Sequence, residues 1–127
     1  VLSVERFPPA PGQGAICIQS REGDERIAEL VAPIGHKDTT LALTAERAFL
    51  AKLDGSCRTP IAAHARLDGQ GQLMLHGVIL TPDGSQIHET HQSGPISAAH
   101  EIGMEAGRFV LDAAGPGFFA GWADLKP

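Results

Sequence analysis

The sequence predicts an α+β domain: a three-stranded antiparallel sheet with helices packed on one face, in the order helix, strand, strand, strand, helix. Two observations support this. Apolar residues recur every three to four positions in residues 38–53 and 97–113, as in amphipathic helices. Residues 61–92 instead have strand-like patterns separated by two turn sequences at 68–71 and 81–85.

Composition narrows the classes of protein that the chain can represent. Its 127 residues have room for one domain, with 43% apolar and 20% charged residues. The net charge is -5 and no basic run occurs, so neither nucleic acid nor an anionic membrane is an expected partner. No apolar stretch approaches the roughly 20 residues needed to span a bilayer, and no signal-peptide pattern precedes the first strand. We therefore expect a cytoplasmic protein.

The first third of the chain reads as a separate unit. Residues 7–14 contain three prolines and two glycines and predict an extended connection. Gln13, between two glycines, either presents its side chain to a ligand or simply completes a turn. Residues 15–18 predict a short buried strand with Cys17 as a structural residue, and 24–32 predict a short helix that ends before Pro33.

We place a domain boundary after this unit, so that residues 1–33 form an appendage and residues 34–127 form the main domain. The chain begins at Val1 rather than at methionine, and we therefore expect a fragment or a processed product.

A helix is expected from a cap at Asp38 or Thr39 to about Leu53. Glu46 and Arg47 are expected on a solvated or locally paired face of this helix. Gly55 stands where a helix C-terminus favours a left-handed residue. The apolar face of this helix comprises Leu41, Ala45, Ala48, Phe49, Leu50 and Leu53.

Three strands are expected after this helix. Residues 61–67 alternate in polarity, 72–80 are apolar on both faces, and 86–92 are mostly polar. The second strand is therefore expected at the centre and the third at an edge. Gly94 and Pro95 should end the sheet.

The final helix should run from about Ser97 to Ala113. The tail at 118–122 either packs on the core or lies at an exposed end. The predicted apolar stripe of the helix is Ala99, Ile102, Ala106, Phe109 and Ala113.

The histidines do not predict a metal site. His88 and His91 are three positions apart on a strand and should face opposite sides. His64 and His76 should also lie on opposite faces if the register of their hairpin follows its turn. Metal ligands must converge, and these four are not expected to do so.

Cys57 lies in a turn between the first long helix and the first main strand, beside Arg58. A thiol in such a loop, next to a cation that favours the thiolate, is a better nucleophile than one in a core. The alternative is a buried cysteine that acts as a small apolar residue.

Four motifs, in this order, resemble the C-terminal portion of the porphobilinogen deaminase family, also called hydroxymethylbilane synthases. They are Pro9-Ala10-Pro11-Gly12-Gln13-Gly14-Ala15, Thr44-Ala45-Glu46-Arg47-Ala48, Leu53-Asp54-Gly55-Ser56-Cys57-Arg58-Thr59-Pro60-Ile61 and Pro82-Asp83-Gly84-Ser85. The resemblance implies a transferase that condenses four porphobilinogen molecules into hydroxymethylbilane and releases ammonia. It also implies that residues 1–33 belong with an N-terminal domain that this chain lacks.

The resemblance implies a cofactor site as well. Cys57 would hold a dipyrromethane primer through a thioether, with Ser56 and Arg58 beside it and Gln13 near the active-site cleft, close to the interdomain hinge. Many relatives have glycine in place of Ser56 and Cys17, so Cys17 is a conceivable second modification site.

In this family the catalytic aspartate and an arginine cluster lie in the first two domains. No catalytic residue is therefore expected in this chain, which should be inactive alone. Its expected partners are porphobilinogen, the growing polypyrrole and the missing domains. We expect a monomer, or association through residues 15–18. The alternative function is a free-standing binding or assembly module with Cys57 as a simple thiol.

Overall fold

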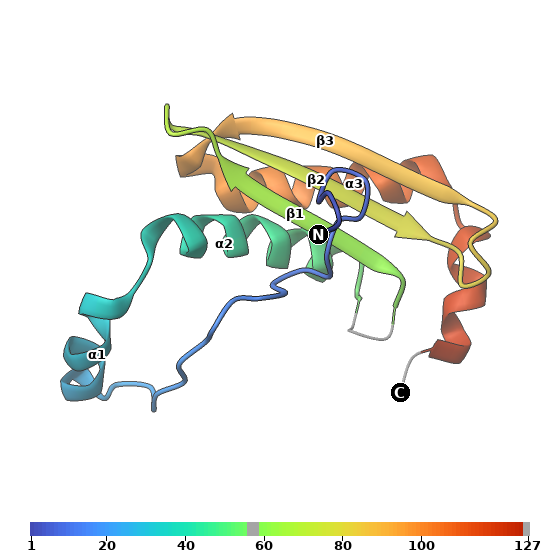
Figure 1. Cartoon of the computed structure of the whole chain (residues 1–127). Coiled ribbons are helices and arrows are strands. Elements are labelled where there is room, and N and C mark those ends of the chain that lie inside the picture. Colours follow the sequence, from blue (N-terminus) through green and yellow to red (C-terminus); the bar gives the residue numbers. More distant parts are fainter. Residues whose placement is uncertain (56–58, 126–127) are drawn as a thin grey trace.

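The computed structural model describes residues 1–55 and 59–125, and its elements are shown in Figure 1. Within these residues no helix is long and apolar enough to cross a membrane. In chain order the elements are α1 (Glu25–Val31), η1 (Ala32–Ile34), α2 (Lys37–Lys52), β1 (Ile61–Leu67), β2 (Gln72–Leu80), β3 (Ile87–Pro95), η2 (Ile96–Ala98), α3 (Ala99–Ala114) and η3 (Phe118–Leu125).

The predicted sheet is confirmed. Its strand order is β1-β2-β3 with both pairs antiparallel, so the two-sided apolar strand β2 is central and the polar strand β3 is an edge. Helices α2 and α3 both cover one face of this sheet (Figure 1). The core lies between the two layers, where the alternate residues of β1 and β2 meet the helices.

The inward stripe of α3 differs from the prediction at two positions, because Ala113 is exposed as well as Phe109. Phe109 is 51% exposed, whereas Val110 is completely buried. The other buried residues of the helix include Ala99, Ile102 and Ala106. Val110 follows Ala106 by four residues and continues their stripe, and Phe109 lies about 100° away from it around the helix.

Small residues bring α2 and α3 into close contact. A Cβ at Gly103 would collide with the backbone oxygen of Ala45 and would lie 2.7 Å from the Cβ of Ala48. A Cβ at Gly77 of β2 would lie 2.7 Å from the ring of Phe49. The ring of Phe49 therefore occupies the space that the missing side chain of Gly77 leaves above the sheet. Such close contacts let a core with few aromatic residues pack densely.

Glu46 is buried, contrary to the prediction of a solvated or locally paired face. It is only 7% exposed. Its Oε1 accepts the N–H of Ala65 at 2.8 Å, and its Oε2 accepts the N–H of Gly12 at 2.7 Å. Ala65 lies on the edge strand β1 and Gly12 lies in the N-terminal linker. One carboxylate on α2 thus joins three segments, and its charge is compensated by backbone donors.

The prediction for His64 and His76 was wrong. They are direct partners in the β1–β2 ladder and therefore lie on the same face of the sheet. The hairpin closes on a bond from the N–H of Asp68 to the oxygen of Gln72, with Gly69 and Gly71 at positive φ. If the turn comprised only residues 68–71, the register would differ by one residue from the observed one. A difference of one residue moves every side chain of a strand to the other face.

Three element boundaries also differ. His36, rather than Asp38 or Thr39, caps α2, because its Nδ1 accepts the N–H of Thr39 at 3.2 Å. Gly94 and Pro95 continue β3 instead of ending the sheet, since they pair with the first residues of β2. Helix α3 begins at Ala99 rather than at about Ser97, because a short 3₁₀ turn, Ile96–Ala98, precedes it.

The strand expected at residues 15–18 is not formed. Residues 15–21 have no regular structure, and Ile16 is 95% exposed. Cys17 is exposed too, so it is not the buried structural residue that we expected. Helix α1 forms as predicted, capped by Asp24, but it buries none of its residues. A strand needs a partner for its N–H and C=O groups, and this segment pairs with none of the described strands.

The C-terminal tail packs on the core, which resolves the two alternatives left by the sequence. Phe118 and Trp122 are both buried. The indole Nε1 of Trp122 donates to the backbone oxygen of Leu80 at 3.1 Å, at the end of β2. The two rings meet edge to face, with centroids 5.9 Å apart.

Replacing Glu46 should destabilise the domain, because its carboxylate accepts two backbone hydrogen bonds. In Glu46→Gln one of the two backbone N–H groups loses its acceptor, and we expect a loss of about 1–3 kcal/mol in the free energy of unfolding. Glu29→Gln, on the exposed α1, is the matched control and should be neutral. Urea unfolding measures both variants, and equal stability of the two would contradict the structural role of Glu46.

Adding a methyl group at Gly103 should also destabilise the domain. Gly103→Ala meets the backbone of Ala45 and forces α2 and α3 apart, at a cost of about 1–3 kcal/mol. Gly117→Ala is the control, because a Cβ there meets no atom within 4 Å. Thermal unfolding should show a lower Tm only for Gly103→Ala. A Tm equal to that of the unsubstituted chain would mean that the helices are not in this contact.

Candidate functional site

The segment before the cysteine loop is held to α2. Ser56, Cys57 and Arg58 lie outside the described residues, and only the segments on either side of them are described. Leu53, the C-cap of α2, is buried. Asp54 adopts the left-handed conformation with φ 49°, a role that the sequence assigned to Gly55. The chain therefore turns one residue earlier than predicted, and aspartate is among the residues that tolerate this conformation.

Gly55 is required for space rather than for a positive φ. Its N–H donates to the backbone oxygen of Leu50 at 3.2 Å. An added Cβ would lie 2.8 Å from a side-chain methyl of Leu50 and would collide with Ile61. Only glycine lets the chain pass this closely between the end of α2 and the start of β1.

The segment after the loop is held to the sheet. Thr59 is buried, and its backbone oxygen accepts the N–H of Ile61 at 2.8 Å. The N–H of Leu80 donates to the oxygen of Pro60 at 3.0 Å, which extends the β1–β2 contact beyond the strand. Each end of the loop is therefore anchored, one on α2 and the other on β2.

Gln13 lies in the linker and takes part in its own turn. Its Oε1 accepts the N–H of Ala10 at 3.2 Å, and its N–H donates to the oxygen of Ala10 at 3.0 Å. Gly12 and Gly14 on either side have positive φ, which explains the glycines of this motif. The side chain of Gln13 is exposed. Gln13 thus completes a turn, as one of the two interpretations from the sequence has it, and contact of its side chain with a ligand stays a prediction.

Helix α2 anchors both segments of the candidate site, a relation that the sequence did not reveal. Glu46 binds the linker at Gly12, next to Gln13, and Leu50 binds Gly55 at the start of the cysteine loop. These two anchors are four residues apart, hence on the same side of the helix and about 6 Å apart along its axis.

The described arginines do not provide a cluster on one element. Arg6, Arg21, Arg26, Arg47, Arg66 and Arg108 are all exposed and come from different segments of the chain. Arg108 is paired with Glu105 on α3 at 2.6 Å. Since a row of carboxylates needs several fixed cations, this arrangement is poorly suited to binding a polycarboxylate.

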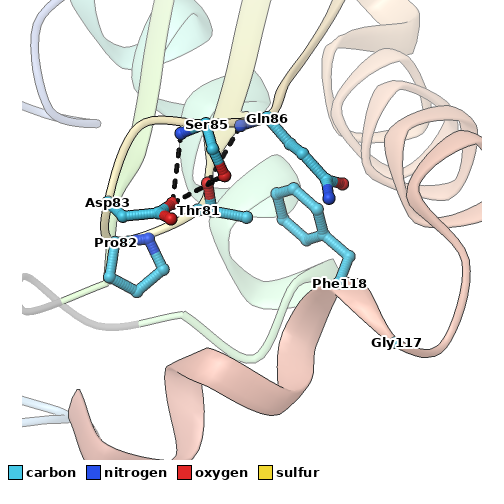
Figure 2. A pocket seen from close by; sticks show the side chains of 7 residues that line it. All are labelled: Thr81, Pro82, Asp83, Ser85, Gln86, Gly117 and Phe118. Carbon is cyan, nitrogen blue, oxygen red and sulfur yellow. Dashed lines mark hydrogen bonds between the residues drawn. The ribbon is translucent and has the colours of Figure 1, made fainter.

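The turn from Thr81 to Gln86 borders a hollow of about 380 Å³ that Phe118 and Gly117 complete (Figure 2). The carboxylate of Asp83, which borders this hollow, is hydrogen-bonded within the turn. Hydrogen bonding from the Thr81 hydroxyl, followed by the N–H and hydroxyl of Ser85, lowers the pKa of Asp83 to about 2. The Asp83 Oδ1 accepts both Ser85 groups, at 3.1 and 2.8 Å. These contacts give the motif a role in shaping the hairpin.

Comparison with known proteins identifies the family. Residues 40–112 match the family model described as porphobilinogen deaminase, C-terminal domain. The chain is 47% identical over 119 residues to the porphobilinogen deaminase of Nitrobacter hamburgensis, an alignment that covers 94% of this chain and 37% of that protein. The chain thus spans little more than a third of the length of this relative. The chain belongs to the porphobilinogen deaminase family and contains its C-terminal domain.

Proposed function

We propose that this chain is the part of a porphobilinogen deaminase that carries the dipyrromethane primer, attached to Cys57 through a thioether. The whole enzyme condenses four porphobilinogen molecules on this primer into hydroxymethylbilane, with release of ammonia, in the cytoplasm. The observation that carries the proposal is the common anchoring of two family motifs on α2, at Glu46 and Leu50, within a chain of this family.

The attachment chemistry suits a cysteine. The thiol of Cys57 loses its proton, and the resulting thiolate attacks the methylene carbon of a pyrrole electrophile whose leaving group has departed, forming the C–S bond. A thioether does not take part in thiol–disulfide exchange, because that reaction needs a disulfide sulfur to attack. The primer therefore persists while the added rings are later released by hydrolysis. Arg58, next in sequence, favours the thiolate.

The anchored flanks suit a site that must serve several additions. Gly55 and Thr59 keep the two ends of the loop in place on α2 and the sheet. Cys57 is two residues from each of these points in the sequence. Gln13 contributes from the linker, whose position Glu46 sets.

Residues 1–33 belong, in this proposal, with the missing N-terminal portion. Ile16, Ile18 and Leu30 are exposed, and α1 has no buried residue. Apolar side chains and unpaired backbone groups of this kind are what a sheet in another domain would cover. That portion would also supply the catalytic carboxylate and the arginines that bind the substrate.

Protein made in cells together with the missing N-terminal portion should carry one dipyrromethane per chain. Intact mass spectrometry should detect the adduct, and it should disappear in Cys57→Ser and persist in Cys17→Ser. In the loaded protein, an alkylating reagent should react with the exposed Cys17 but not with Cys57, whose sulfur already carries the primer. An unmodified mass with both thiols free would favour the alternative of a simple binding module.

The chain alone should not convert porphobilinogen, even when loaded. Electrostatic stabilisation and positioning supply most of the rate in such reactions, and the described arginines are scattered over the chain. Purified loaded protein should release no ammonia and gain no pyrrole units. Addition of the N-terminal portion should restore both, except with Cys57→Ser. Steady turnover by the 127-residue chain alone would contradict the proposal that the catalytic groups lie elsewhere.

A further inference from the structure

The face of the sheet opposite α2 and α3 carries a row of histidines. His64, His76 and His91 are successive partners across β1, β2 and β3. Residues paired in this way project to the same side of a sheet. The rings of His76 and His91 stack, with centroids 4.2 Å apart and planes inclined by 12°.

A carboxylate completes a group of three ligands on this face. Glu89 precedes His91 by two positions on β3 and therefore projects to the same side. Its Oε2 lies 3.3 Å from the Nε2 of His76. The ligand atoms of His76, Glu89 and His91 all lie within 4.8 Å of one another.

This separation is close to what a metal ion requires. With Zn–N and Zn–O bonds of about 2.0–2.1 Å and tetrahedral angles, two ligand atoms on one ion are roughly 3.3–3.4 Å apart. The pair His76–Glu89 already has that spacing. His76 is held in place, with 12% of its side chain exposed, whereas Glu89 and His91 are exposed. Because an imidazole nitrogen binds a metal in the plane of its ring, the exposed ring of His91 must rotate out of its stack with His76 to share an ion with it.

Two of the three ligands border a hollow that Glu89 does not line. His76 and His91 border this hollow, which has a volume of about 220 Å³ and also includes Met74 and Ser93. Arg66 also lines the hollow and weakens the attraction for a cation, while the net charge of -5 of the chain favours it.

We propose that His76, Glu89 and His91 bind a divalent first-row transition ion, with Zn²⁺ as the best fit. Two imidazoles and one carboxylate favour zinc, copper or nickel over magnesium and calcium, which prefer oxygen ligands. The ion would connect the edge strand β3 to the central strand β2. This site is independent of Cys57 and of the proposed reaction.

The test is a titration of the untagged chain with Zn²⁺ in a Cys17→Ser, Cys57→Ser background, so that thiols do not contribute. Calorimetry should show one ion per chain. The imidazole NMR signals of His76 and His91 should shift, while those of His100 on α3 should not. At a hundredfold excess over Kd, the Tm should rise by roughly 5–10 °C. Mg²⁺ in place of Zn²⁺ should have no effect.

Variants identify the ligands. His76→Asn, His91→Asn and Glu89→Gln should each weaken Zn²⁺ binding at least about tenfold. His100→Asn and Glu101→Gln, both exposed on α3, should leave it unchanged. The proposal is overturned if no saturable binding appears at about 1 mM Zn²⁺, or if the ligand variants bind as tightly as the controls. The stacked rings and the His76–Glu89 pair would then serve only as contacts between strands.

Discussion

The carboxylate of Glu46 is the interaction on which the arrangement of this chain depends. A buried charge is tolerated only when hydrogen bonds replace its lost hydration. Here the donors are the N–H of Ala65 and the N–H of Gly12, which belong to segments distant in sequence. The same region includes a bond from the N–H of Ala63 to the oxygen of Pro9. The linker therefore covers the outer edge of β1, where unpaired backbone groups would otherwise recruit another strand.

The linker is bonded to the domain at two neighbouring points. Pro9 accepts the N–H of Ala63 on β1, and Gly12 donates to Glu46 on α2. Gly12 and Gly14, on either side of Gln13, have positive φ, and residues 15–33 follow this turn. The linker and Gly55, at the start of the cysteine loop, are thus both held by α2, at residues about one turn apart.

The sequence predicted the fold well because each element had its own periodicity. The apolar pattern on both sides of 72–80 placed β2 at the centre, and the polar 86–92 placed β3 at an edge. The prediction failed where a shift of one residue along a helix decides which side chain faces the sheet. Phe109 and Val110 are adjacent, and only the packing against the sheet selects Val110. A signal for Glu46 did exist, since it precedes the buried Phe49 by three positions and so lies near the apolar face.

The candidate sites were less predictable, for two different reasons. The cysteine motif identified the family, but its spacing could not show that Leu50 and Glu46 anchor the loop and the linker from one side of α2, because that depends on tertiary contacts. The histidine row was missed because a hairpin register cannot be read from turn residues alone. The turn in which Asp68 bonds to Gln72 brings His64 and His76 to one face, and the separate register of β2 with β3 adds His91 to them. A shift of one residue in the first register would remove only His64 from the row, whereas a shift in the second would remove His91 and Glu89. The residues on the helix-covered face of the sheet can therefore be predicted from hydrophobic periodicity. The residues that meet on the open face depend on the strand registers, which the geometry of two turns sets.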